Sequence, residues 1–172
     1  GDIKKHLESL GASVKRELCW SKSNAFPRNI ERSFVQAREY AIWGVKKGKW
    51  TFNKRKGKGY ETGMFTYPVQ KSEHPAKKPE GMFSEIIEIL SNPGDLVVDP
   101  FTGLGTTNVA AEKLGRKHIG FELDATFHAL AVESLNSVNG GNNGITSKGG
   151  VSSTNSVHPQ SDNNSSESVN KV

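Results

Sequence analysis

Four residues of this 172-residue chain have the types and the spacing of a nucleotide-binding site. Asp99 and Glu122 each end a short, largely apolar run that we expect to be a β-strand. Gly103 and Gly105 follow Asp99, and glycines at such positions let the backbone turn sharply and approach a ligand. Because ligands of open α/β sheets bind at the carboxyl ends of the strands, the four residues predict a ligand site at one sheet edge.

The elements that would position these residues follow one another closely. The run 96–98 predicts a buried strand, and the run 118–122 predicts a second strand. Between them, Thr106 and Thr107 are the predicted caps of a helix that Gly115 ends. Strand, glycine turn, helix and strand form half of a nucleotide-binding unit and indicate the α/β class.

The glycine pattern narrows the choice of nucleotide. A dinucleotide fingerprint needs a third glycine three residues after Gly105, and Asn108 stands there. This departure weakens the interpretation as a nicotinamide enzyme, which stays as an alternative. The chain contains no G-K-[ST] run after four spacer residues, so the phosphate loop of nucleoside triphosphatases is excluded.

Composition indicates one folded domain followed by a tail. Residues 139–172 contain no aromatic side chain and are rich in Gly, Asn and Ser, so we expect a disordered tail after a folded part, 1–138. The single cysteine, Cys19, permits no disulfide within the chain, and a reducing cytoplasmic compartment is the default. No apolar run approaches the roughly 18 residues that a membrane-spanning helix requires.

Positive charge is concentrated between residues 46 and 78. The net charge of the chain is +5, yet this stretch alone has ten Lys or Arg residues against Glu61 and Glu73. Aromatic residues alternate with the charges, which favours a nucleic-acid partner, here double-stranded DNA, over a solvated lysine-rich loop. We call residues 46–78 the basic stretch.

The remaining pattern predicts a mixture of helices, strands and loops. The apolar spacing predicts helices at 2–11, 80–90 and 125–138, a single helical turn at 32–37, strands at 14–20, 39–45 and 50–53, and a long loop at 54–73. The strands 39–45 and 50–53 flank a lysine-rich turn and are predicted to form a hairpin.

Four short motifs together resemble those of a known enzyme family. They are W-S-K at 20–22, H-P-A-K-K-P at 74–79, D-P-F-T-G-L-G-T-T at 99–107 and I-G-F-E at 119–122. In this order they resemble the S-adenosylmethionine-dependent DNA amino-methyltransferases that modify adenine N6 or cytosine N4. The order is similar to that of the subgroup whose catalytic half comes first. The resemblance covers about residues 13–137.

This resemblance implies a fold, a cofactor and a set of site residues. It implies part of a Rossmann-like class I methyltransferase sheet with helices on both faces, and S-adenosylmethionine bound by a cofactor half, 79–138. Glu122 would accept both ribose hydroxyls, and Lys78 would lie near the methionine carboxylate. His74 is either part of this site or a turn residue. The cofactor would be lined by Asp99, Pro100, Phe101, Gly103, Gly105 and Thr106.

One family motif is missing from the chain. The enzymes of this family use a D-P-P-Y-type tetrapeptide to hold the target amino group, but the only Asp-Pro here is Asp99-Pro100, and no Pro-Pro occurs. In this subgroup the tetrapeptide would lie upstream of Gly1. We therefore expect a carboxyl-terminal portion of a methyltransferase that is inactive alone and needs a missing amino-terminal half or a second chain.

Two further alternatives concern activity and target base. The chain could instead be a non-catalytic subunit that binds DNA or cofactor. Methylation of cytosine C5 needs a nucleophilic cysteine, and Cys19 has no basic partner nearby in sequence, so we set that reaction aside. The ending Lys78-Pro79 favours adenine N6 over cytosine N4 within the resemblance.

Overall fold

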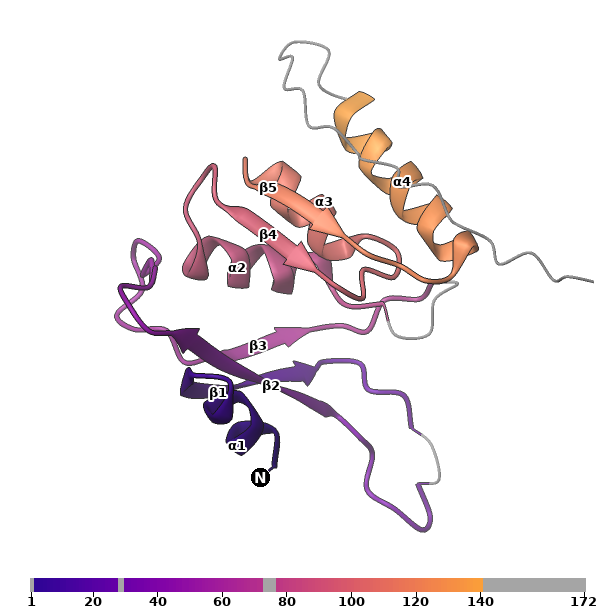
Figure 1. Cartoon of the computed structure of the whole chain (residues 1–172). Coiled ribbons are helices and arrows are strands. Elements are labelled where there is room, and N and C mark those ends of the chain that lie inside the picture. Colours follow the sequence, from indigo (N-terminus) through magenta and orange to yellow (C-terminus); the bar gives the residue numbers. More distant parts are fainter. Residues whose placement is uncertain (1, 28–29, 73–76, 141–172) are drawn as a thin grey trace, which may run out of the picture.

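The computed structural model describes residues 2–27, 30–72 and 77–140 and confirms the α/β class. The described elements form a three-stranded sheet and a separate pair of strands, with helices packed against them (Figure 1). In chain order they are α1 (Asp2–Ser9), β1 (Ala12–Lys22), β2 (Arg38–Lys46), β3 (Met64–Tyr67), α2 (Glu80–Leu90), β4 (Leu96–Asp99), α3 (Thr106–Lys113), β5 (Lys117–Gly120) and α4 (Ala125–Gly140).

The three-stranded sheet has β1 at its centre. β1 pairs antiparallel with β2 and parallel with β3, with an irregularity between Val14 and Arg16. The predicted strands 14–20 and 39–45 are confirmed, each with added residues at both ends. Trp20 of β1 packs with Phe65 of β3 and Met82 of α2, which makes one of the two buried cores.

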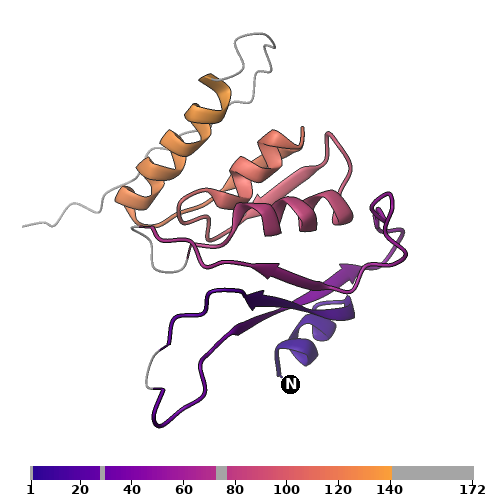
Figure 2. The ribbon, with the colours of Figure 1, turned by 180° about the vertical axis from the view of Figure 1, so that it is seen from behind.

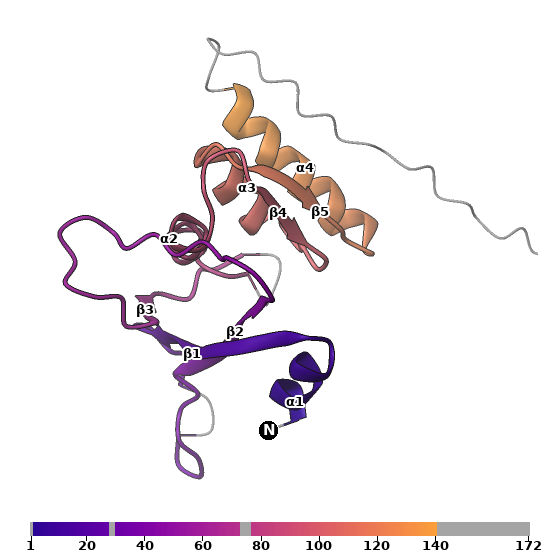
Figure 3. The same cartoon turned by 60° about the vertical axis from the view of Figure 1, so that its left-hand side comes forward.

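The second core lies between α2, α3 and β4. Ile87 of α2 packs against Ala110 and Ala111 of α3, and Val97 of β4 lies against this cluster. The helix predicted at 80–90 is confirmed, and the buried Pro79 precedes its first turn. Seen from behind, α2 and α3 lie in front of the β4–β5 pair, and Figure 3 shows α2 end-on above β3 (Figures 2 and 3).

The strand predicted to be buried at 96–98 is covered on one face only, and there Val97 is partly buried. β4 and β5 are parallel, and Val97 and His118 face the helices. On the other face Leu96 and Val98 are about half exposed, at 54% and 53%. The prediction of full burial was wrong for the described residues because no described element covers this face.

Three other local predictions were wrong. Residues 50–53 do not return as a strand, because Asn53 instead binds the end of α2, with its backbone N–H 2.7 Å from the carbonyl oxygen of Ile89. The predicted loop 54–73 contains β3, which is short and has only Phe65 buried. Residues 32–37 form turns and irregular backbone rather than a helical turn.

The last helix is longer than predicted. α4 begins at Ala125 as expected and includes residues 139 and 140 of the predicted tail; the rest of that tail, 141–172, lies outside the described residues. Asp124 caps the helix, since its Oδ1 accepts the backbone N–H groups of Thr126 and Phe127 at 2.8 and 3.0 Å. No helix in the described part of the chain is long and apolar enough to cross a membrane.

Candidate functional site

The predicted ligand site lies at the carboxyl ends of β4 and β5. Asp99 pairs with Gly120 in the parallel register, and the backbone N–H of Phe121 donates to the carbonyl oxygen of Asp99 at 2.9 Å. The N–H of Thr102 then donates to the carbonyl oxygen of Phe121, also at 2.9 Å. These bonds hold the turn after β4 beside the segment after β5, which brings the two predicted carboxylates to one edge.

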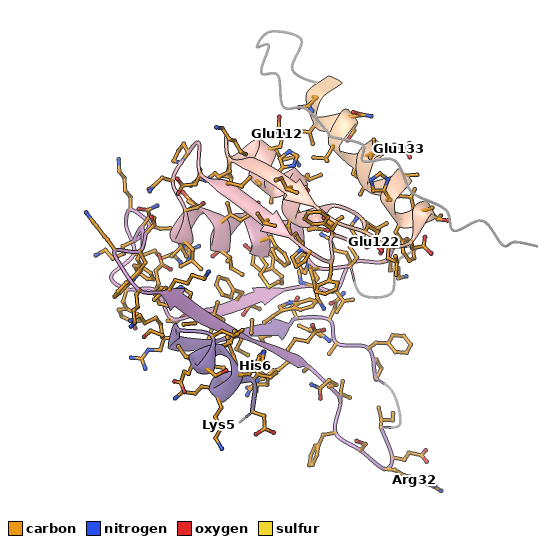
Figure 4. All side chains as sticks on the ribbon, in the orientation of Figure 1. Lys5, His6, Arg32, Glu112, Glu122 and Glu133 are labelled. Atoms are coloured by element: carbon orange, nitrogen blue, oxygen red, sulfur yellow. The ribbon has the colours of Figure 1, made fainter. Side chains whose placement is uncertain are left out.

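Glu122 is bound directly to the glycine turn. Its Oε2 accepts the backbone N–H of Gly103 at 2.8 Å, and its Oε1 accepts that of Asp124 at 3.0 Å. The backbone N–H groups of Asp124 and Gly103 lower the pKa of Glu122, so the carboxylate is ionised at neutral pH. Each carboxylate oxygen has a further lone pair for a ligand hydroxyl. Figure 4 shows Glu122 at this edge, near the start of α4.

The two glycines of the turn have different structural tasks. Gly103 has a φ of 54° and donates its N–H to Glu122. Gly105 has a φ of 79°, and a Cβ on it would lie 3.1 Å from the Cβ of Ala131. Gly105 therefore lets α4 pack closely against the turn, whereas Gly103 orients the predicted ligand-binding carboxylate.

The helix after the turn begins without a side-chain cap. Gly105 is the residue before the first turn of α3, and this N-cap position makes no side-chain hydrogen bond to the helix. The prediction that Thr106 and Thr107 act as caps was therefore wrong, because both residues lie inside the helix. Gly115, with a φ of 72°, follows the helix end as predicted.

Asn108 links α3 to the turn through its side chain, a role that the sequence pattern did not predict. Its side chain is buried and accepts a hydrogen bond from the hydroxyl of Thr102, while its Nδ2 lies 3.4 Å from Nδ1 of His118. A Cβ on Gly120 would lie 2.7 Å from the Oδ1 of Asn108. The position that a dinucleotide fingerprint gives to glycine is thus used for a polar bridge between α3, the turn and β5.

Three predicted site residues lie at the start of the turn, and two of them are exposed. Oδ1 of Asp99 accepts the backbone N–H of Phe101 at 3.0 Å, which fixes the start of the turn. Pro100 is exposed, and Phe101 is 87% exposed. An apolar ring in solvent beside a carboxylate is a surface on which a nucleoside could stack and form hydrogen bonds.

Lys78 lies two residues before α2 and is held by an ion pair. Its Nζ is 2.6 Å from Oε2 of Glu39, and Nζ of Lys22 is 2.8 Å from Oε1 of the same carboxylate. No sequence pattern indicated a role for Glu39 or this link between β1, β2 and α2. His74 of the H-P-A-K-K-P motif, which was expected to be either part of the site or a turn residue, lies outside the described residues.

Part of the basic stretch is engaged within the protein. Arg55 forms ion pairs with Glu61, at 2.6 Å, and with Glu85, which also accepts the hydroxyl hydrogen of Tyr67. The hydrogen bond from Arg55 lowers the pKa of Glu61 to about 2. Burial and the hydrogen bond to Glu85 raise the pKa of Tyr67 to about 12. Arg55 therefore stabilises the loop, and its charge is largely neutralised.

The paired strand ends, the glycine turn and the carboxylate after the second strand define a nucleotide-binding α/β fold of the Rossmann-like methyltransferase class. A family model described as DNA methylase, N6_N4_Mtase, matches residues 3–133, and the chain belongs to this family. The predicted resemblance to this family is therefore confirmed.

Two relatives of known class agree with this assignment. The Type II methyltransferase M2.DpnII of Streptococcus pneumoniae is 31% identical over an alignment of 147 residues, and the match covers 77% of this chain and 55% of the relative. The Type II methyltransferase M2.LlaDCHI of Lactococcus lactis subsp. cremoris is 33% identical over 144 residues, covering 76% and 54%. The chain thus spans about half the length of these curated relatives.

A solved structure identifies the cofactor of the family. The crystal structure of the M1.HpyAVI–SAM complex shares 41% sequence identity with this chain and superposes with a TM-score of 0.72. The match covers 78% of this chain and 68% of that one. The family uses S-adenosylmethionine, as the resemblance implied.

Proposed function

We propose that this chain is the cofactor-binding portion of an enzyme that transfers a methyl group from S-adenosylmethionine to an amino group of DNA. The observation that supports the proposal best is the position of Glu122, ionised and fixed by Gly103 at the carboxyl ends of two parallel strands. Both curated relatives are Type II methyltransferases, which supports a role in a DNA modification system of that type.

The residues at this edge fit the proposed cofactor. Glu122 keeps a lone pair on each oxygen, which suits two vicinal ribose hydroxyls. The glycine turn allows close approach of the backbone, and the exposed ring of Phe101 offers a stacking surface for adenine. The bound cofactor would supply an electrophilic methyl group, while Asp99, Pro100, Gly105 and Thr106 shape and support the turn that holds it.

The catalytic tetrapeptide of the family is proposed to come from outside these 172 residues. The sequence contains no D-P-P-Y-type motif. One face of the β4–β5 pair is covered by no element of the described residues and exposes Leu96, Val98, Ile119 and Phe121, whereas parallel strands are normally covered on both faces. We infer that an upstream part of the same protein, or a second chain, packs there and contributes the motif.

Double-stranded DNA is the proposed substrate, with adenine N6 favoured over cytosine N4. Lys46, Lys47, Lys49, Lys56 and Lys58 are exposed, and exposed cations of this density attract a phosphate backbone. The preference for adenine rests on the Lys78-Pro79 motif ending alone. The second candidate function is a non-catalytic subunit that binds cofactor or DNA, and the missing tetrapeptide is the observation that favours it.

A methyl-transfer assay distinguishes the two functions. Residues 1–172 are incubated with tritiated S-adenosylmethionine and mixed-sequence duplex DNA, alone and with an upstream half that carries a D-P-P-Y-type motif. We expect no transfer by the chain alone, and transfer to adenine N6 when the upstream half is fused or added. Transfer by the chain alone, or none under either condition, would contradict the proposal. Methyl on cytosine N4 would keep the enzyme class and reverse the base preference.

A further inference from the structure

An arm projects from the protein between β1 and β2. The structure describes residues 23–27 and 30–37 of this connection, which we call the arm, and these residues form no helix or strand. The arm extends well beyond the end of the three-stranded sheet (Figures 1 and 3). It lies outside both the proposed cofactor site and the basic stretch.

The base of the arm is fixed to the body of the protein. The backbone N–H of Lys22 donates to the carbonyl oxygen of Ala37 at 2.8 Å, which closes the two limbs of the arm. The side chain of Asn24 pairs with the backbone of Val69: its Nδ2 donates to the carbonyl oxygen at 3.1 Å, and its Oδ1 accepts the N–H at 2.5 Å. The arm therefore leaves the sheet in a defined direction.

The tip of the arm combines apolar and cationic side chains. Phe34 is 100% exposed and Ile30 is 68% exposed. Arg32 lies between them in sequence, and Figure 4 shows it near the far end of the arm, pointing away from the body. Arg38, at the end of the returning limb, is also exposed, and Glu31 is the one carboxylate of the tip. An apolar ring among guanidinium groups suits a partner that offers both negative charge and flat apolar groups.

The arm lies at the edge of the molecule where the methyl donor is proposed to bind. It follows the carboxyl end of β1, which points the same way as the carboxyl ends of β4 and β5 (Figure 1). The basic stretch begins at the opposite end, where Lys46 pairs with Ala12 at the start of β1. A strand of 11 residues spans roughly 35 Å. The lysines that follow β2 therefore cannot contact phosphates next to a base at the cofactor edge, which leaves the arm for that contact.

A base-modifying enzyme has to open the duplex before it can act. A paired amino group is out of reach of a methyl donor, so the target base is turned out of the stack, at a cost in free energy. Apolar side chains such as Phe, Leu or Ile that insert between base steps unstack DNA in other proteins. A two-stranded ribbon fits the major groove, and the arm has two limbs joined at their base.

We propose that the arm enters the DNA duplex beside the target base, that Phe34 inserts between neighbouring base pairs, and that Arg32 and Arg38 bind the flanking phosphates. The inference rests on the proposed function and adds the element that opens the duplex. The partner is double-stranded DNA. Packing of the arm against the upstream half of the enzyme is the competing outcome in the experiments below.

Comparison of double-stranded with single-stranded substrate tests the insertion of Phe34. The chain, joined to the upstream half as in the methyl-transfer assay, receives one long DNA of mixed sequence as a duplex or as its separated strands, and kcat/KM is measured for each. The variants are Phe34→Ala and Phe34→Leu. Ile3→Ala is the control, because Ile3 of α1 is also exposed, at 68%, and lies outside the arm. Circular dichroism verifies that each variant folds.

Phe34→Ala should impair the enzyme on duplex DNA alone. We expect kcat/KM on the duplex to fall by about tenfold or more and kcat/KM on single strands to stay within about twofold, since a single strand has no base pair to open. Phe34→Leu keeps an apolar wedge and should retain most of the duplex activity, and Ile3→Ala should match wild type on both substrates. An unchanged rate on the duplex would overturn the proposal. So would an equal loss on both substrates, which indicates that Phe34 packs against the upstream half.

Arg32→Gln tests the phosphate contact through binding. Fluorescence anisotropy with a labelled duplex should show a log–log salt slope that is smaller by about 0.9 than that of wild type. Lys5→Gln, exposed on α1, removes one charge elsewhere and should leave the slope unchanged (Figure 4). Equal slopes for Arg32→Gln and Lys5→Gln would contradict the arm as a DNA contact. If the wild-type enzyme methylates neither substrate, the proposed function fails and this inference with it. If it methylates both and Phe34→Ala does not discriminate between them, only this inference fails.

Discussion

Thr102 of the glycine turn donates a hydrogen bond from its hydroxyl to the side-chain oxygen of Asn108, and both residues are buried. The bond connects the turn after β4 to the first turns of α3. Nδ2 of Asn108 reaches His118 of β5, whose Nε2 lies 3.2 Å from Oε2 of Glu112. The proposed cofactor turn is therefore supported by a continuous polar network rather than by packing alone.

Substitution of Asn108 by Ala should destabilise the fold by about 1–3 kcal/mol, since it leaves the hydroxyl of Thr102 without its partner in a buried position. Urea unfolding followed by circular dichroism measures the change, with Asn136→Ala on the exposed side of α4 as the matched control. An Asn108→Ala chain as stable as the Asn136→Ala chain would show that the network does not support the turn.

The stability of the loop that contains Arg55 should depend on pH between about 4.5 and about 2. The pKa of Glu61 falls from 4.5 to about 2 in the folded protein because of Arg55. A lowered pKa means that the stabilisation is complete above the ordinary value and is lost as the pH falls from about 4.5 to about 2. Wild-type protein should lose more melting temperature over this range than Glu61→Gln. An equal loss of melting temperature in wild type and Glu61→Gln would contradict the stabilising role of the Arg55–Glu61 ion pair.

Exposed lysines of the basic stretch, and not Arg55, should carry the DNA affinity. Substitution of Lys54, Lys56 and Lys58 by Ala should flatten the dependence of log affinity on log salt by about 0.9 for each phosphate that is no longer bound. A control chain with Lys4, Lys5 and Lys117 changed to Ala removes the same charge elsewhere. Fluorescence anisotropy with a labelled duplex measures both slopes, and equal slopes would make the basic stretch a solvated surface.

Local signals predicted the elements around the proposed cofactor site well. The spacing of Met82, Ile86, Ile87 and Leu90 predicted α2 with its observed ends, and the run 96–98 with two following glycines predicted β4 and its turn. These signals are local, because a helix stripe or a glycine turn is specified by residues close in sequence. The α/β class followed from their order.

Contacts between distant residues were not predictable in this way. β3 has four residues and is recognisable only through its pairing with β1, more than forty residues earlier. The link from Glu39 to Lys78 joins two motifs that look unrelated in sequence. In the sequence, Asn108 only occupied the third glycine position of a dinucleotide fingerprint. Its structural role is apparent only from its burial against Thr102 and Gly120. Full burial of the run 96–98 was wrongly expected because apolar character does not specify what covers a strand.

The proposed function depends above all on Glu122 binding the ribose of S-adenosylmethionine at the carboxyl ends of β4 and β5. Calorimetric titration of the wild-type chain, Glu122→Ala and Glu133→Ala tests this role directly. Glu133 is exposed on α4 and controls for the removed charge (Figure 4). We predict that Glu133→Ala binds like wild type and that Glu122→Ala binds about tenfold or more weakly, because its charge-assisted hydrogen bonds are removed. Equal affinity of all three proteins would contradict the ribose role of Glu122.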